Sequence, residues 1–122
     1  MAEPRKLVEI TRVEKPWGHE LIWARTERYV GKILHIKAGH ALSLQYHKVK
    51  DETVHVLTGR MRFQTGEGDV LSEQVLEQGQ SFHITPLLRH RMIAETDCDI
   101  LEASTPELDD VVRLDDRYGR TS

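Results

Sequence analysis

The sequence predicts an all-β domain, a sandwich or a barrel, from three observations. Apolar and polar residues alternate with a period of two in many short segments. Turn-forming sequences such as KPWG, KAGH, TGEGD and EQGQ separate these segments at roughly even spacing. The 3.6-residue period of long amphipathic helices is not the dominant one. Short strands repeated in this way are typical of antiparallel sandwiches and barrels.

The alternating segments give the expected strands in chain order. The first is LVEITRV at 7–13, and the others lie at 19–24, 29–36, 53–58, 60–63, 74–76, 81–85 and 98–103. The best helix candidate is STPELDDVV, where Thr105 can cap a helix and Pro106 can take its first position. We expect at most a turn or two of helix there. Because no repeat or linker interrupts the chain, we expect one domain over residues 1–122.

The composition excludes several classes of function. The 122 residues are 39% hydrophobic and 30% charged, which is ordinary for a globular protein. A net charge of −3 gives no electrostatic case for binding nucleic acid or a membrane surface. The single cysteine, Cys98, excludes an internal disulfide and a cysteine-rich zinc site. The first 18 residues contain no apolar run long enough for a signal peptide, so we expect a cytoplasmic protein.

The stretch GHALSLQYHKVKDETVHVLTG at 39–59 brings three metal-ligating residue types close together. Gln45 and His47 are two residues apart, so on a strand their side chains point to the same face. A polar turn follows, and the next strand can bring Glu52 back beside His47. Burial of a carboxylate among apolar side chains is costly unless a cation accompanies it. The pattern therefore predicts an interior site for a divalent metal, with a simple polar hairpin as the alternative.

This stretch resembles the first motif of the cupin superfamily, in which a glycine, a His-x-His pair, a glutamate and a second glycine recur at fixed spacing. Gly39, Glu52 and Gly59 match that spacing, and so does Gln45-x-His47, with glutamine in place of the first histidine. Glutamine at this position is also found in phosphomannose isomerases. A glutamine carbonyl is a harder ligand than imidazole, which shifts the site toward oxygen-preferring metals.

The segment GQSFHITPLLRHRMIA at 79–94 resembles the second cupin motif. Gly79 and His90 match, whereas the proline, glycine and asparagine of the motif are replaced by Thr85, Leu87 and Ala94. The spacing is kept, so the resemblance implies that His90 is the fourth metal ligand. His83 is the competing histidine in the same segment.

A closer resemblance is to the type II phosphomannose isomerase domain, the cupin module also found at the end of bifunctional mannose-phosphate guanylyltransferases. It covers about residues 14–120 and rests on KPWGHELIW, GKILHIKAGHALSLQYH, STPELDDVVRL and DDRYGR. Three histidines usual in that family are replaced here by Lys48, Val49 and Thr53. The resemblance implies the cupin jelly roll, a double-stranded β-helix, that binds one divalent zinc, manganese, nickel or iron ion through Gln45, His47, Glu52 and His90.

The same resemblance implies a metal-dependent aldose–ketose isomerase acting on a sugar or sugar phosphate, as mannose-6-phosphate isomerase does. Such a reaction needs a metal to polarise the carbonyl and a base to move a proton between C1 and C2. Lys32 and His83 are the candidate bases. Arg117 and Arg120 are the candidate phosphate ligands, because arginine matches phosphate oxygens bidentately. Two alternatives stay open: another metal chemistry, such as that of a dioxygenase or lyase, and a non-catalytic sugar-binding module.

Small cupins are commonly dimeric, so the resemblance also implies a homodimer. The segments 29–36 and 7–13 are apolar enough to pair across subunits. An exposed edge strand of this kind usually needs a partner or a cover.

Overall fold

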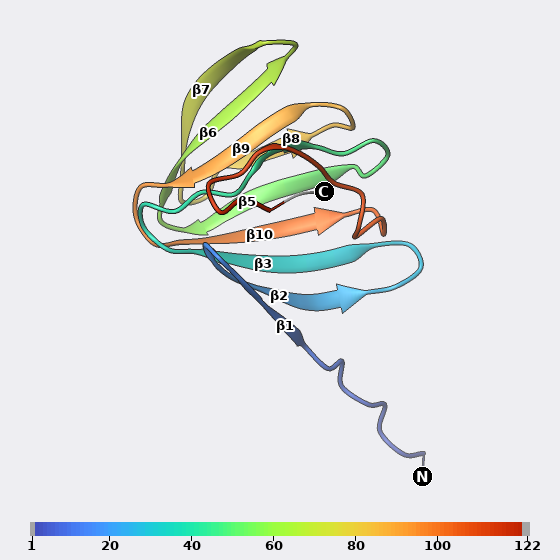
Figure 1. The fold of residues 1–122 in the computed structure, drawn as a ribbon. Helices are drawn as coiled ribbons and strands as arrows, with labels where there is room; N and C mark the ends of the chain where they lie inside the picture. Colours follow the sequence, from blue (N-terminus) through green and yellow to red (C-terminus); the bar gives the residue numbers. More distant parts are fainter. Residues whose placement is uncertain (1, 121–122) are drawn as a thin grey trace.

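The structure is a computed structural model that describes residues 2–120, and these form two antiparallel β-sheets (Figure 1). The six-stranded sheet has the order β1-β2-β3-β10-β5-β8, and the five-stranded sheet the order β11-β4-β9-β6-β7. The strands are β1 (Thr11–Lys15), β2 (Gly18–Arg25), β3 (Val30–Ile36), β4 (Leu44–Tyr46), β5 (Glu52–Thr58), β6 (Arg60–Glu67), β7 (Val70–Glu77), β8 (Ser81–Ile84), β9 (Arg89–Ala94), β10 (Cys98–Ser104) and β11 (Val112–Asp115). The all-β prediction is confirmed. No helix long and apolar enough to cross a membrane occurs in residues 2–120.

In the six-stranded sheet, the period-two pattern of the sequence matches an alternation of buried and more exposed side chains. In β10, Ile100 and Glu102 point into the space between the sheets, whereas Leu101 between them points outward and is partly exposed. Neighbouring strands keep this phase, since Glu102 is paired with Lys32 of β3 and Ile100 with Leu34. One face of the sheet therefore lines the interior, and the other is its outer face.

The hydrophobic core occupies one end of the space between the sheets. Its fully buried side chains include Ile36, Val56, Met61, Phe63 and Ile100. Cys98 is buried in the same cluster and is paired with Ile36. Toward the opposite end, the inward positions of β3, β5 and β10 carry Lys32, Glu52 and Glu102. The interior thus changes from apolar to charged along the strands.

Some predicted elements differ from the structure. The first strand begins at Thr11, and residues 7–10 have no strand partner, so the prediction over 7–13 is only partly right. The segment 105–111 is a series of turns without helix. Thr105 does not cap it, because its hydroxyl accepts a hydrogen bond from the backbone N–H of Asp51 at 2.9 Å. The alternation did not predict the short strands β4, β9 and β11.

Candidate metal centre

Three buried side chains from distant segments converge at the charged end of the interior. His47 follows β4, Glu52 begins β5, and His90 lies in β9. Glu52 Oε1 is 3.5 Å from His47 Nε2 and 3.6 Å from His90 Nε2. The three residues are 1–3% exposed. One ligand atom from each lies within 4.8 Å of the others, so the cluster can hold one metal ion.

The hydrogen bonds of the two histidines leave their inward-facing nitrogens available. The Nδ1–H of His47 donates to the carbonyl of Asp110 at 2.5 Å, and that of His90 to the carbonyl of Leu88 at 2.9 Å. The lone pair of each neutral ring is then on Nε2. Both Nε2 atoms are buried and have no hydrogen-bond partner among the described residues. An unpartnered buried nitrogen is costly, and a divalent cation between these atoms and Glu52 would satisfy both. The residues present therefore fit a metal ion.

The loop that carries His47 is fixed by the carboxylate of Asp110. That carboxylate accepts the backbone N–H groups of Lys50 at 2.8 Å, Val49 at 2.7 Å and Lys48 at 3.0 Å. These hydrogen bonds lower the pKa of Asp110 to about 2. Asp110 thus holds the His47 ring through its carbonyl and the following loop through its side chain.

A second contact to this loop comes from a strained residue. Leu87 donates its backbone N–H to the carbonyl of His47 at 2.7 Å. Its φ of 73° lies in the left-handed region, where a leucine is unfavourable. The second cupin motif has glycine at this position. The turn shape therefore survives the replacement of that glycine by leucine.

Gln45, the fourth predicted ligand, lies beside the cluster. It is paired with His90 in the β4–β9 ladder, so the two side chains lie on the same face of the sheet. Its Oε1 accepts a hydrogen bond from the hydroxyl of Ser43 at 2.8 Å. It lines the same cavity as His47. The structure thus brings all four predicted ligands to one region.

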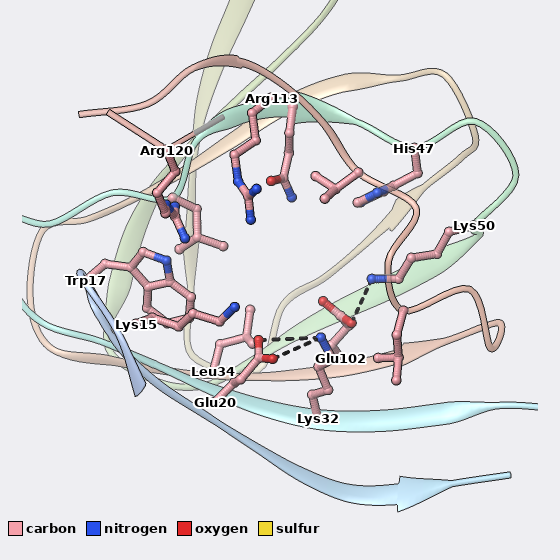
Figure 2. A pocket seen from close by; sticks show the side chains of 14 residues that line it. Lys15, Trp17, Glu20, Lys32, Leu34, His47, Lys50, Glu102, Arg113 and Arg120 are labelled. Atoms are coloured by element: carbon pink, nitrogen blue, oxygen red, sulfur yellow. Dashed lines mark hydrogen bonds and ion pairs between the residues drawn. The ribbon is translucent and has the colours of Figure 1, made fainter. Parts of the chain in front are cut away.

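The cluster adjoins a cavity of about 90 Å³ that is rich in charged side chains (Figure 2). Its apolar lining includes Trp17 and Leu34. An adjoining hollow of about 470 Å³ shares several of these lining residues, Lys32 among them. The charged residues around the cavity are five cations and two carboxylates: Lys15, Lys32, Lys50, Arg113, Arg120, Glu20 and Glu102. Such a cavity favours an anionic ligand.

Ion pairs link the cluster to the cavity. Lys50 Nζ is 2.9 Å from Glu52 Oε2 and 3.2 Å from Glu102 Oε2. Further along, Lys32 Nζ is 3.3 Å from Glu20 Oε1 (Figure 2). Buried acids and bases therefore alternate from the cluster into the cavity.

These groups shift one another's pKa values. Burial disfavours the charge on Glu52, but the adjacent His47 ring and the Lys50 ammonium outweigh it and lower the pKa of Glu52. Burial likewise opposes the charge on Lys50, yet Glu102 and Glu52 together raise the pKa of Lys50. Burial dominates at Glu102 and raises its pKa. Glu52 is thus held ionised, as a metal ligand must be, whereas Glu102 is displaced toward its neutral form.

The other predicted site residues separate into two groups. Lys32 and Arg120 line the cavity, and Arg120 is held there by Asp116, with Nε 3.0 Å from Oδ2. His83 is exposed on β8, where its Nε2 is 2.6 Å from Asp51 Oδ1. Arg117 is also exposed, and its Nη1 donates to the carbonyl of Gly39 at 3.0 Å. Neither of the latter two is among the cavity residues.

Sequence reasoning missed five charged cavity residues: Lys15, Glu20, Lys50, Glu102 and Arg113. A usable signal existed for Glu20 and Glu102, because each occupies an inward position of an alternating strand. A charge at such a position indicates a function or a partner. No such signal exists for Arg113, since β11 itself is not predicted by alternation.

Comparison with known proteins shows the family of the chain. The cupin domain family model matches residues 32–103, so the chain belongs to the cupin family. Mannose-1-phosphate guanylyltransferase ManC of Salmonella typhimurium is 34% identical over 113 residues, or 88% of this chain and 23% of that protein. Xanthan biosynthesis protein XanB of Xanthomonas campestris is 30% identical over 115 residues, or 90% of this chain and 24% of that protein.

The chain thus spans about a quarter of the length of these relatives. Their similarity confirms the predicted relationship to the cupin region of bifunctional guanylyltransferases. Among solved structures, KdgF from Halomonas sp. matches with a TM-score of 0.70 at 20% identity, covering 84% of this chain and 91% of that one. This match supports the jelly-roll fold.

Proposed function

We propose that the chain is a metal-dependent aldose–ketose isomerase that acts on a sugar phosphate. The observation that carries the proposal is the position of the His47, Glu52 and His90 cluster, next to a cavity with more cations than carboxylates. A sugar phosphate offers a carbonyl and hydroxyls for the metal end and an anion for the cationic end. The similarity to a mannose-1-phosphate guanylyltransferase supports a phosphorylated sugar as the ligand.

The residues of the chain divide the chemical tasks between them. A divalent ion held by the cluster would polarise the carbonyl of the sugar. A base in the cavity must then move the proton between C1 and C2. Lys32 and Glu102 both line the cavity, and a carboxyl group whose pKa is raised by burial is suited to accept and return a proton. We do not assign this task to His83, because it is exposed on β8 and is not among the cavity residues.

The anionic group of the substrate has its own set of partners. Lys15, Arg113 and Arg120 line the part of the cavity away from Lys50 (Figure 2). Arginine side chains bind phosphate oxygens with paired hydrogen bonds. Of the two arginines predicted for this role, we propose Arg120 alone, because Arg117 is not among the cavity residues.

The test is an isomerase assay on the purified chain loaded separately with zinc, manganese, nickel or ferrous iron. We expect interconversion of mannose 6-phosphate and fructose 6-phosphate. NMR in D₂O measures it through deuterium that enters C2 of mannose 6-phosphate and C1 of fructose 6-phosphate. Unphosphorylated mannose is the matched control and should turn over far more slowly. Oxygen consumption without interconversion would contradict the proposal and favour oxygenase chemistry. Binding of the sugar phosphate without any turnover would instead favour a binding module.

A further inference from the structure

A second hollow, of about 300 Å³, lies on the outer side of the six-stranded sheet. It shares no lining residue with the charged cavity of the interior. The buried residues Glu52 and Ser104 contribute to its lining, together with Arg28. Its other lining residues occupy the outward positions of β5 and β10 or flank β3, β5 and β10: Tyr29, Asp51, Thr53, Ala103 and Thr105. A hollow of this size is at the lower end of the range typical of small-molecule sites, about 300–1,000 Å³.

Trp23 of β2 provides a flat, partly exposed aromatic surface beside this hollow. Its indole covers Gly31, because a Cβ added to Gly31 would come within 2.6 Å of the ring. One face of the ring therefore packs on the sheet, while 41% of the residue stays exposed. Gly31 is paired with Ala103, which lines the hollow, so the indole lies one strand away from it. Tyr29, which is 54% exposed, precedes Gly31 by two residues and lies on the same side of the sheet.

Polar groups lie at the other side of the hollow. Asp51 Oδ1 is 2.6 Å from Nε2 of the exposed His83, which is paired with Thr53 across the β5–β8 ladder. The backbone N–H of Asp51 donates to the hydroxyl of Thr105, which holds the start of this segment in place. Among the lining side chains that reach solvent, Arg28 and Asp51 carry opposite charges. The hollow therefore offers donors and acceptors without the excess of cations that lines the interior cavity.

We propose that this hollow and the adjoining indole of Trp23 bind a neutral pyranose unit of a carbohydrate. One face of a pyranose ring consists of C–H groups that pack on an aromatic ring, and its hydroxyls need hydrogen-bonding partners around it. Aromatic and polar groups lie side by side here, and the balanced charge favours a neutral ligand. Strand β3, predicted to pair with a second subunit, has both edges occupied by β2 and β10, so only its outer face is open to a partner. The proposal does not rest on the proposed enzymatic function.

NMR titration of the full chain with methyl α-mannoside, methyl β-glucoside and methyl β-galactoside tests the proposal. Methyl glycosides do not open to the carbonyl form, so an isomerase site cannot turn them over. The chain has two tryptophans, and we expect at least one glycoside to shift the indole N–H signal of Trp23 and leave that of the buried Trp17 in place. His47→Ala should show the same shift, because the metal cluster lies in the interior. This result would hold even if the isomerase assay failed.

Three outcomes of this titration would overturn the proposal. The first is no shift at Trp23 with any of the glycosides up to about 100 mM, or a shift confined to Trp17. The second is tighter binding of mannose 6-phosphate than of the glycosides at Trp23, which would show an anion site. The third is a Trp23 signal that moves with protein concentration and not with the glycosides, which would assign the face to a second copy of the chain.

Variants of the aromatic surface locate the site, with binding measured from the signals of the glycoside. Trp23→Ala should weaken binding about tenfold, whereas Trp23→Phe keeps a flat ring and should bind more tightly than Trp23→Ala. Gly31→Ala should also weaken binding, because its added Cβ displaces the indole. Leu57→Ala is the matched control, since it removes a side chain 36% exposed on β5 that does not line the hollow. Circular dichroism checks that each variant is folded. If Leu57→Ala weakens binding as much as Trp23→Ala, or Trp23→Phe binds no better than Trp23→Ala, the proposed site is wrong.

Discussion

The two ends of the interior differ in the chemistry of their inward-facing side chains, which are apolar at one end and charged at the other. Strand β10 carries one residue of each kind within three positions. Ile100 is fully buried in the hydrophobic core. Glu102, the next inward residue, is 5% exposed and is paired with Lys50 beside the cavity. The same alternation places both, so backbone geometry does not distinguish them. The apolar end gains free energy from burial, whereas at the charged end burial works against the charges.

The difference indicates where stability and function reside in this fold. Neutral side chains would lower the desolvation cost at the charged end, yet inward positions on three neighbouring strands there carry Lys32, Glu102 and Glu52. Charges buried at a cost to folding are typical of sites that bind or react. Substitutions at the apolar end should therefore act on folding, and those at the charged end on chemistry.

The largest expected effect on stability is at the apolar end. Ile100→Ala removes a fully buried side chain and leaves a cavity, which should lower the free energy of unfolding by about 2–5 kcal/mol. Leu101→Ala, on the partly exposed outer face of the same strand, should cost about 1 kcal/mol or less. Urea denaturation measures both. Equal losses would show that the two faces of β10 do not differ as described.

Glu102→Gln should separate function from stability. It removes a carboxylate whose pKa burial raises, so the variant should be no less stable than wild type at neutral pH. In the wild type, the stability present below the ordinary carboxyl pKa declines as the pH rises through the raised pKa. The variant should lack that decline. Thermal unfolding between pH 4 and 8 measures this, and the isomerase assay should show turnover strongly reduced in the variant. Full turnover would remove Glu102 from the proposed mechanism.

Metal binding at the charged end should depend on Asp110, which supports the loop after His47. Asp110→Ala removes three hydrogen bonds to backbone N–H groups and loosens the support of His47. Metal affinity should fall about 10- to 100-fold, the usual effect of losing groups that orient a ligand. Because the pKa of Asp110 is lowered to about 2, its contribution to stability is present above the ordinary aspartate pKa and is lost as the pH falls toward 2. Asp109→Ala is the matched control and should bind metal like the wild type.

The smallest expected effect comes from the strained turn. Leu87→Gly relieves a left-handed conformation, and the leucine side chain is 64% exposed, so little packing is lost. Relief of strain should exceed the entropic cost of glycine by about 0.5 kcal/mol. Val49→Gly, at an exposed position with no positive φ, should destabilise the chain instead. A loss of stability in Leu87→Gly would contradict this expectation. It would mean that the leucine side chain stabilises the fold by more than its left-handed backbone conformation costs.

The sequence predicts the fold well because strand alternation and motif spacing are local properties. It also brings Gln45, His47, Glu52 and His90 together, since the motif frame fixes which strands meet. It fails where long-range pairing decides the outcome. Arg113 reaches the cavity through the pairing of β11 with β4, and His83 lies outside because β8 presents it on the exposed face. The extent of β1 likewise depends on a pairing partner and not on the apolar letters of 7–10.

The most direct test of the central claim is elemental analysis of the chain after incubation with manganese, zinc, nickel or ferrous iron. We predict about one divalent ion per wild-type chain and loss of most of it in His47→Ala. His55→Ala should keep the ion, because His55 lies outside the cluster and its Nδ1 is 2.7 Å from the hydroxyl of Ser81. Circular dichroism confirms that each variant is folded. A folded wild type that binds none of these ions, or a His55→Ala variant that loses metal while His47→Ala keeps it, would contradict the account.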